Sequence, residues 1–489
     1  MEKKKIDKKT LLHIGLIIFG AILLLIPAFH SNIWFDESYS VAIVNHSFSE
    51  IWKIGSNDVH PILYYWMLKI INLIFGTNII AYRIFSVLGI ITLGIIGFTH
   101  IRKDFGKKVG LLFTFFSLFL PVMLNYALEI RMYSWTIVFV TLMAIYLNRF
   151  IKNKDFKNII LFGVFSLISC YMHYYALVCA GIINLGLIIY VIKNKKEFEK
   201  GIIKKFIIVE VIQVVLYLPW LACFLMQALR VSSGFWIQIQ FPQILIDVIN
   251  FQFKGSLKET IPTIFAIIIY LYILYIIIKN IKNKQNIKEG IVPIIIYLAV
   301  IAIVAVVSLV SPILYARYLF TITGLLIFSI SYFLAKEDNK YIITVICIIV
   351  SILSIMNLVA NVKENYDSFN GKAVEYLREN VKSDDILLYA DMGNGGVTAT
   401  LVDNNNQHFL NLGYWSIEEA YKAYAPHMKV SYSIEDAAKD AKGRIYIIDT
   451  GDLKLYNQLE NKEQYKEIER QKFEEKYKNY TYQIIVLEK

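Results

Sequence analysis

The sequence has few charged residues and few cysteines, and each shortage excludes a class of protein. Only 18% of its 489 residues are charged, whereas 57% are hydrophobic and 15% are aromatic. This composition argues against an ordinary water-soluble domain and indicates an integral membrane protein. The four cysteines lie within apolar runs and lack the spacing of metal ligands (Cys170, Cys179, Cys223 and Cys347). Disulfide bonds and zinc–thiolate sites are therefore not expected.

The sequence also lacks a continuous basic surface and a leader cleavage site. Its net charge is +11, but the lysines fall in short clusters between apolar runs. This pattern is typical of cytoplasmic loops in membrane proteins, and it argues against a nucleic-acid partner. The first apolar run, 11–29, follows three lysines at positions 3–5, but it is too long for a signal peptide and no small-residue cleavage site follows. We interpret it as an uncleaved membrane anchor.

Long apolar runs recur through the first three quarters of the chain. Runs of about 17–25 residues are long enough to cross roughly 30 Å of hydrocarbon. The basic clusters all fall on the cytoplasmic side if the short run 62–75 lies at the outer interface instead of crossing the membrane. About eleven transmembrane helices are then predicted, at 11–29, 79–100, 109–125, 133–149, 158–172, 176–192, 206–224, 261–279, 290–310, 317–335 and 341–360. The N-terminus is expected in the cytoplasm, with the loop 30–78 and the tail 363–489 outside it.

Several polar motifs fall at the outer ends of these predicted helices, although none of them was used to choose the orientation. They are Asp36-Glu37, Asp58-x-His60, Glu129-x-Arg131-x-Tyr133, His173 and Arg317-Tyr318. Charged residues close to apolar spans are functional candidates, because desolvating them costs free energy. Their gathering on one face favours an outward-facing site.

The acids of the first loop have a structural and a chemical interpretation. Asp36 and Glu37 suit the first turn of a helix expected over 37–52, since a helix N-terminus attracts negative charge. They equally suit a catalytic pair. Asp58 and His60 share this loop and are a possible oxygen/nitrogen metal site, although their spacing fits no strong template. Pro61 is more simply the first residue of a helix.

The later motifs also leave alternatives open. Glu129 and Arg131 are close enough in sequence to form an ion pair with each other. The alternative is that Arg131 binds phosphate. Arg317 has no acid near it in the sequence, and its guanidinium group suits an anionic ligand such as phosphate. His173, among tyrosines, suits a hydrogen-bonded interfacial histidine better than a metal ligand.

The order of these motifs resembles a known family. It is similar to GT-C superfamily glycosyltransferases that use polyprenyl-phosphate sugars, in particular the bacterial protein O-mannosyltransferase and aminoarabinose transferase group. The resemblance covers residues 10–360 and rests on Trp-Phe-Asp-Glu-Ser-Tyr (34–39), His-Pro-Ile-Leu-Tyr-Tyr (60–65), Ala-Leu-Glu-Ile-Arg-Met-Tyr (127–133), His-Tyr-Tyr-Ala (173–176) and Ala-Arg-Tyr-Leu (316–319). The family often has His-Pro-Pro or Lys-Pro-Pro where this chain has residues 60–62, which leaves the choice of donor open.

The resemblance implies roles for the candidate residues. A sugar would pass from a polyprenyl phosphate to an acceptor hydroxyl on a protein, glycolipid or wall polymer, with inversion at the anomeric carbon. Asp36 would be the general base and Glu37 its support. The departing phosphate would be bound by Arg131 and Arg317, with His60 and Lys69 as helpers. Further candidates are Asp58, Glu129, Tyr133, His173, Tyr64 and Tyr318. No cofactor is assigned; a divalent metal is an option, with Asp58 and His60 as ligands.

The tail after residue 362 has a different pattern. Apolar runs of strand length (386–390, 444–449 and 482–487) alternate with helical stretches (372–379 and 434–441). This alternation predicts a small soluble α/β domain at 363–489, beside a transmembrane domain at 1–362. The glycine-rich stretch 391–396 resembles a phosphate-binding turn, but a flexible surface loop is the preferred interpretation.

A polytopic transporter or lipid-linked sugar flippase is the alternative function. The sequence shows no inverted internal repeat and no pair of Gly/Pro-broken spans in matching halves. Its ionisable residues gather at the outer helix ends, whereas a transporter needs access from both faces. The enzyme is therefore the preferred interpretation.

Overall fold

The computed structural model describes residues 7–232, 237–366, 371–389, 391–410, 422–424, 427–439, 441–451, 453–459, 464–474 and 477–488. The chain divides into two compact units. The helical unit contains Met1–Ala28, Val59–Tyr64 and Arg83–Asn361, and the sheet unit contains Phe29–Asp58, Tyr65–Tyr82 and Val362–Lys489. The tail thus shares a unit with most of the first loop. The division at residue 362 expected from the sequence stays a prediction.

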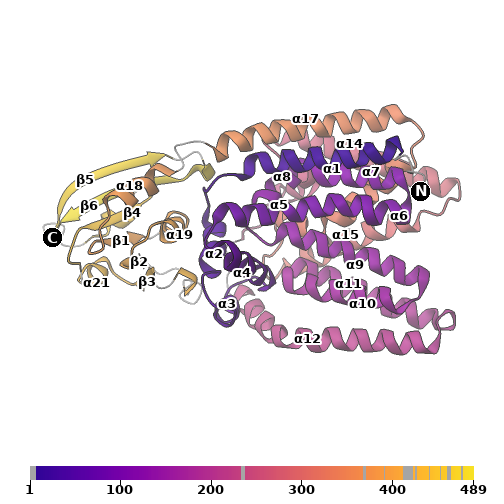
Figure 1. Cartoon of the computed structure of the whole chain (residues 1–489), viewed down its shortest axis with the longest axis horizontal. Coiled ribbons are helices and arrows are strands. Elements are labelled where there is room, and N and C mark those ends of the chain that lie inside the picture. Colours follow the sequence, from indigo (N-terminus) through magenta and orange to yellow (C-terminus); the bar gives the residue numbers. More distant parts are fainter. Residues whose placement is uncertain are drawn as a thin grey trace, which may run out of the picture. The chain divides into compact units, whose positions relative to one another are not determined.

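The helical unit is built from helices of different lengths, most of them long and apolar, and several run side by side in Figure 1. They are α1 Lys8–Leu25, α5 Ile79–Ile96, α6 Arg102–Phe105, α7 Lys107–Phe119, α8 Pro121–Leu128, α9 Tyr133–Asn153, α10 Phe156–Met172, α11 Tyr174–Lys193, α12 Lys200–Ser232, α13 Gln243–Asn250, α14 Thr260–Lys282, α15 Lys288–Val307, α16 Thr323–Ala335 and α17 Lys340–Asn365. Within the described ranges, nine helices are long and apolar enough to cross a membrane, or ten if the bent pair α7 and α8 is one span. The prediction of a polytopic helical membrane protein is confirmed.

Two of the predicted spans differ from a single long helix: one is bent, and the other is short. The span expected at 109–125 is the pair α7 and α8, bent by 57°. Leu120 at the break has extended backbone angles, and Pro121 begins α8. Proline disfavours helical angles in the residue before it, and it starts a helix without losing a hydrogen bond. The span expected at 158–172 is α10, which has 17 residues.

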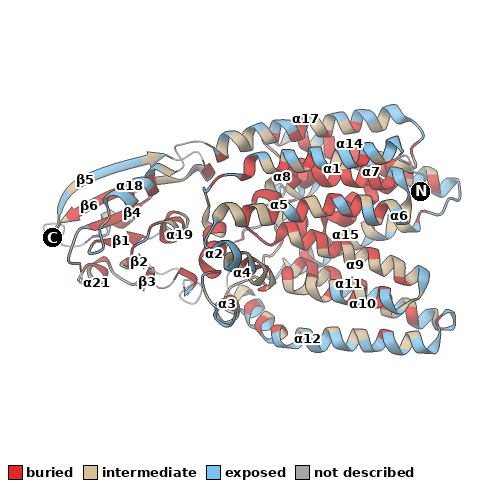
Figure 2. Cartoon of the chain, viewed as in Figure 1, coloured by how far each residue is buried: buried red, intermediate tan, exposed pale blue. Residues whose placement is uncertain are grey.

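Burial separates a central helix from a peripheral one. In the segment Ala316–Ala335, which includes α16, 89% of the most apolar stretch is buried, whereas the buried share of the corresponding stretch of α12 is 17%. Figure 2 shows the exposed colour along most of α12. At Gly324 in α16 an added Cβ would overlap the hydroxyl of Thr141 in α9. The close contact of these two helices therefore requires glycine at this position.

The first loop forms three short helices: α2 Phe35–Ile43, α3 Phe48–Gly55 and α4 Leu63–Phe75. The expectation of one continuous helix over 37–52 is wrong, because the chain turns at residues 44–47 and starts again. Ser47 caps α3: its hydroxyl accepts the Glu50 amide, and the Glu50 carboxylate accepts the Ser47 amide at 2.9 Å. This capping box is a helix-start signal that lay inside the predicted helix.

In the described part of the tail, six strands form a mixed sheet. Its strands are β1 Ile386–Tyr389, β2 Gln407–Leu410, β3 Met428–Ser431, β4 Ile445–Asp449, β5 Lys466–Glu474 and β6 Thr481–Glu488, in the order β3-β2-β1-β4-β6-β5. The pairs β1–β2, β1–β4 and β2–β3 are parallel, and β6 is antiparallel to both β4 and β5. The expected strands β1, β4 and β6 and the expected helices α18 Lys372–Asn380 and α21 Ile434–Ala438 are present.

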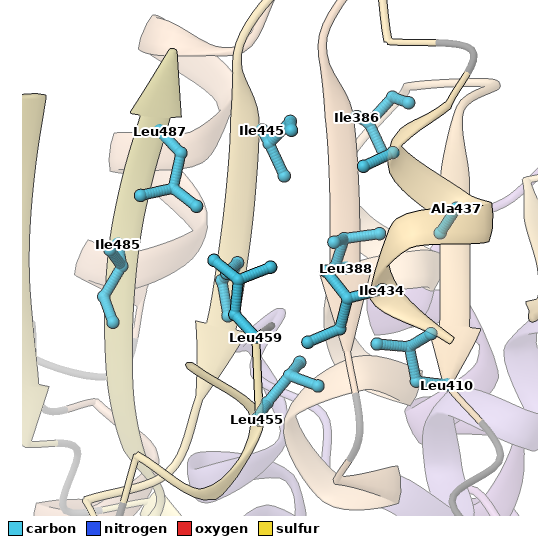
Figure 3. Close-up of a cluster of buried hydrophobic side chains, with 12 residues drawn as sticks. Ile386, Leu388, Leu410, Ile434, Ala437, Ile445, Leu455, Leu459, Ile485 and Leu487 are labelled. Carbon is cyan, nitrogen blue, oxygen red and sulfur yellow. The ribbon is translucent and has the colours of Figure 1, made fainter. Parts of the chain in front are cut away.

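Helices cover both faces of this sheet. On one face, side chains of β1, β4 and β6 pack with α21 and with α22 Lys454–Asn457 in the apolar core that Figure 3 shows. On the other face lies α19 Met392–Leu401, whose Gly395 approaches the Tyr389 side chain. The expectation of a flexible loop at 391–396 is wrong. Asp391 caps α19 by accepting the amides of Gly393 and Asn394, and the glycines form its first turns.

Candidate functional site

The acidic pair begins helix α2, as the structural interpretation of the sequence expected. Asp36 and Glu37 both lie in its first turn. The Glu37 side chain is fully buried, and its Oε2 accepts the Trp34 amide at 3.4 Å and the Tyr477 hydroxyl at 3.1 Å. Asp36 is half-buried. The two neighbouring acids therefore differ: Glu37 is held by local and tail groups, and Asp36 has the greater exposure to solvent.

A second polar group lies within the helical unit, where helices meet end to end. We call it the histidine–arginine cluster: His60, Glu129, Arg131, His173 and Arg317. His60 precedes α4, Glu129 and Arg131 lie between α8 and α9, His173 lies between α10 and α11, and Arg317 lies in the 3₁₀ segment Ala316–Ile322 before α16. Polar side chains collect at these breaks because the helix ends leave backbone groups that need partners.

In the folded chain Arg317 forms an ion pair with an acid that is distant from it in the sequence. Its guanidinium lies 3.6 Å from the Glu129 carboxylate, with 20% and 12% of the two side chains exposed. The guanidinium also lies over the rings of Tyr133 and Tyr315, each centroid at 5.9 Å. The ion pair of Glu129 recorded here thus joins two distant segments of the chain. Arg317 is held by charge and by aromatic faces at the same time.

One ring nitrogen of His173 accepts a hydrogen bond, and the other has none among the described residues. Its Nδ1 accepts the Tyr175 backbone amide at 3.1 Å, which makes it the N-cap of α11 and places the ring proton on Nε2. Among the described residues, Nε2 is buried without a hydrogen-bond partner. The ring is packed by Tyr318 (centroids 4.9 Å apart), Tyr133 and His60 (5.9 Å each). The expected hydrogen-bonded histidine is therefore present, and it also presents a buried donor.

Both histidines of the cluster are kept neutral. Burial lowers the pKa of His173 to about 3, and the Arg131 charge adds to the effect. Burial likewise holds the pKa of His60 well below its usual value, with further contributions from Arg131, His173 and Arg317. Arg131 itself is buried, with 4% of its surface exposed. At neutral pH the cluster therefore contains two cations, one carboxylate and two neutral imidazoles.

The remaining predicted residues have separate contacts. The hydroxyl of the buried Tyr64 is 2.8 Å from the Ser86 hydroxyl. Tyr65 donates to Asp58 at 3.5 Å, and Lys69 donates to Asn72 at 3.1 Å. Asp58 and Lys69 belong to the sheet unit together with the acidic pair, whereas the histidine–arginine cluster, Tyr64, Tyr133 and Tyr318 belong to the helical unit. In the described part of the chain, no group of three or more His, Cys, Asp or Glu residues is arranged to hold a metal ion.

Two supporting residues were missed from the sequence. Tyr175 joins the loop before α16 to α11: its hydroxyl donates to the Ile313 carbonyl at 2.9 Å and accepts the Tyr315 amide at 3.2 Å. Arg83 in α5 is buried, and it donates to the Leu128 carbonyl at the end of α8. A charge inside an apolar run was the available signal for Arg83. Tyr175 lies in the His-Tyr-Tyr-Ala motif (173–176), and its place in that motif was the available signal.

Part of the chain matches a known protein family, and the whole fold is similar to solved structures. Residues 59–223, about a third of the chain, match the family described as dolichyl-phosphate-mannose-protein mannosyltransferase. No curated protein sequence matches the chain. The structure is similar to that of ArnT from Cupriavidus metallidurans in the apo state, with TM-score 0.64 and 8% identity, covering 98% of both chains.

Two further solved structures are similar. ArnT from the same organism bound to undecaprenyl phosphate has TM-score 0.57 and 9% identity, covering 97% of both chains. The Archaeoglobus fulgidus oligosaccharyltransferase complex with Zn and sulfate has TM-score 0.48 and 12% identity, covering 90% of this chain and 68% of the other. The ArnT matches extend over almost the whole chain. The protein therefore has the GT-C fold that its motifs predict, and it is a multi-pass membrane protein.

Proposed function

We propose that the protein is a membrane glycosyltransferase that moves a sugar from a polyprenyl-phosphate donor to an acceptor hydroxyl. The fold is that of ArnT, which has been solved bound to undecaprenyl phosphate, and residues 59–223 match a mannosyltransferase family. The observation that carries the proposal is the histidine–arginine cluster. Two arginines and a buried imidazole donor at the junctions of membrane helices are suited to a lipid-linked phosphate.

The cluster suits a phosphate that leaves during the reaction. Arg131 and Arg317 supply positive charge, and His60 and the Nε2–H of His173 supply neutral polar groups beside them. Lys69, in the sheet unit, is a further candidate helper. Fixed donors around a group that gains negative charge lower the barrier, because they need no reorganisation when the bond breaks.

The acidic pair supplies the base. The acceptor hydroxyl loses its proton to Asp36 while its oxygen forms a bond to the anomeric carbon. The bond from that carbon to the phosphate oxygen breaks on the opposite side, and the polyprenyl phosphate leaves with the electron pair. The product sugar is inverted. Glu37, buried and hydrogen-bonded, orients the turn that carries Asp36.

The site would face the side of the membrane opposite the lysine-rich N-terminus. The basic loops then lie in the cytoplasm, and the acceptor is an extracytoplasmic protein, glycolipid or wall polymer. Nucleotide sugars are disfavoured as donors on this side, because they are cytoplasmic. The sugar and the length of the polyprenol are left open by these arguments.

The test is sugar transfer from a panel of radiolabelled polyprenyl-phosphate sugars by purified protein in vesicles. Wild type is compared with Asp36→Asn and with Asp403→Asn, a matched change at an exposed tail residue. We expect transfer or slow donor hydrolysis by wild type and Asp403→Asn, and loss of at least 100-fold for a folded Asp36→Asn. Full activity of Asp36→Asn would remove the base assignment. Movement of intact donor across the vesicle membrane without turnover would instead support a flippase.

A further inference from the structure

The tail contributes directly to the surroundings of the acidic pair. Helix α2 and the tail belong to the same compact unit. Within it the Tyr477 hydroxyl donates to Glu37 Oε2 at 3.1 Å, and Tyr477 is itself buried, with 4% of its surface exposed. A fully buried carboxylate needs such donors, because leaving it without hydrogen bonds costs several kcal/mol. One partner of Glu37 thus comes from the far end of the sequence.

A second tyrosine of the tail contacts the backbone of the same turn. The Tyr480 hydroxyl accepts the Phe35 amide at 3.1 Å, which satisfies one of the free amides at the start of α2. Burial raises the pKa of Tyr480 to about 12, and the negative charges of Asp36, Asp391 and Glu37 add to this rise. Its phenol therefore stays protonated beside the two acids at any physiological pH.

Helix α19 packs against the next residues of α2. A Cβ built at Gly396 would lie 2.9 Å from the Ser38 hydroxyl, 2.8 Å from the Tyr424 hydroxyl and 3.1 Å from the Phe35 ring. The hydroxyls of Ser38 and Tyr424 are themselves 2.9 Å apart, and Ser38 also donates to the Phe35 carbonyl at 2.7 Å. Only glycine at position 396 permits this approach. The tail therefore contacts the first turn of α2 through three of its segments.

We infer that the C-terminal domain is a positioning element of the active site, in which Tyr477 holds Glu37 and thereby fixes the turn that carries Asp36. The inference rests on the proposed function for the role of Asp36. The domain acts through α2 and needs no contact with the substrate. Its sheet is the scaffold: β6 follows directly after the Tyr477–Tyr480 segment, and α19 follows β1.

A merely structural contact has a different signature from a positioning one. If Tyr477 only stabilised the fold, its loss would lower the melting temperature and the yield but leave the turnover of the folded enzyme unchanged. If it positions the acidic pair, turnover falls while donor binding is retained. Its effect must also depend on Glu37, because the two residues act through one hydrogen bond.

The experiment is a double-mutant cycle with Tyr477→Phe and Glu37→Gln, measured as kcat and donor KM for the full-length protein. We expect Tyr477→Phe to lower kcat by about 10- to 100-fold with KM changed less than about threefold. The double variant should be no slower than Glu37→Gln alone. Tyr432→Phe, at a tail residue that is 63% exposed, is the matched control and should behave as wild type.

The possible results distinguish failure of this inference from failure of the proposed function. Normal kcat for Tyr477→Phe beside an inactive, folded Asp36→Asn overturns this inference and leaves the proposed function standing. Additive losses in the double variant also overturn it, because Tyr477 would then act independently of Glu37. Absence of transfer by wild type with every donor overturns the proposed function and this inference with it. If Tyr477→Phe does not fold, Tyr480→Phe replaces it, because it removes the acceptor of the Phe35 amide in the same turn, with the same expected fall in kcat at constant KM.

Discussion

The Glu129–Arg317 ion pair gives the sharpest prediction, because the same arginine is proposed to bind the donor phosphate. In the structure, Glu129 lies 3.6 Å from Arg317 and partly neutralises it. Replacing Glu129 by Gln removes that charge and keeps the shape of the side chain. We expect the variant to be less stable on its own and to bind a polyprenyl phosphate more tightly than wild type does.

The magnitude follows from the geometry. Two unit charges 3.6 Å apart attract by about 5 kcal/mol at an effective dielectric constant of about 20. Desolvation of the two largely buried side chains offsets much of this, so that the net loss on removing Glu129 is about 1–2 kcal/mol. A bound phosphate can restore the same charge balance around Arg317. The affinity for the phosphate should therefore rise by roughly 5- to 30-fold in the variant.

The assay is thermal unfolding of the detergent-purified protein with and without polyprenyl phosphate, together with titration of the lipid. Glu129→Gln should melt a few degrees lower without lipid and gain more from lipid than wild type does. Arg317→Gln should also melt lower, but it should lose affinity by at least tenfold. Equal or weaker lipid binding by Glu129→Gln would refute the reasoning, because the pair would not then compete with the ligand.

Three further predictions concern the helical unit. Folding lowers the pKa of His173 to about 3, so below about pH 6.5 the unfolded chain binds one proton more than the folded chain does. The contribution of His173 to stability should be complete above pH 6.5 and decline below it, by up to about 1.4 kcal/mol per pH unit. His173→Gln should therefore flatten the slope of melting temperature against pH. Asn357 donates to the Pro121 carbonyl at 3.0 Å and to the Asn125 side chain at 2.8 Å. Asn357→Leu should therefore lower the free energy of unfolding by about 1 kcal/mol in a denaturant titration. An unchanged free energy would show that the bend at Pro121 does not depend on Asn357. Gly324→Val should destabilise the protein by about 1–3 kcal/mol through overlap with Thr141 in α9, measured by the same titration; an unchanged midpoint would contradict the close packing.

The membrane helices could be predicted because their signal is local. A run of apolar residues of membrane length needs no partner to be recognised, and each predicted span coincides with a helix or with the bent pair α7 and α8. The bend itself follows from Pro121, a local feature that the prediction did not use. Strands β1, β4 and β6 were likewise recognisable, since each is buried along most of its length and reads as an apolar run.

The missed strands carry a weaker signal for a physical reason. Strand β5, at Lys466–Glu474, is rich in charge because it lies at an edge of the sheet and much of it is exposed. Strands β2 and β3 have four residues each, as β1 does, but polar residues interrupt them, so that neither is an apolar run. Their register is set by β1, which pairs with β2, so their existence depends on a tertiary context that no window of sequence contains.

The residues of the candidate site could be named one by one from the sequence, but their arrangement could not. The sequence indicated Glu129, Arg131, His173 and Arg317 by their residue type and by their place at helix ends. The sequence offered Arg131 as the nearest partner for Glu129, which stays a prediction, and it could not indicate the pair with Arg317 that the structure records. The pair with Arg317 depends on how the segment before α16 returns to the junction of α8 and α9, which is a property of the whole bundle. The same holds for the hydrogen bond from Tyr477 to Glu37.

The neutrality of the histidines explains how such a site can exist before its ligand arrives. With Arg131, Arg317 and Glu129 charged and both imidazoles neutral, the cluster carries a net charge of about +1 at neutral pH. The proposed donor, a sugar linked through a phosphodiester, carries one negative charge, which is opposite to the net charge of the cluster. When the sugar leaves, the phosphate monoester approaches two negative charges, since its second pKa is about 6. The extra charge can draw Arg317 away from Glu129 and accept the Nε2–H of His173. In the proposed reaction both interactions would strengthen as the bond breaks, which is the condition for lowering the barrier and not merely for binding the substrate.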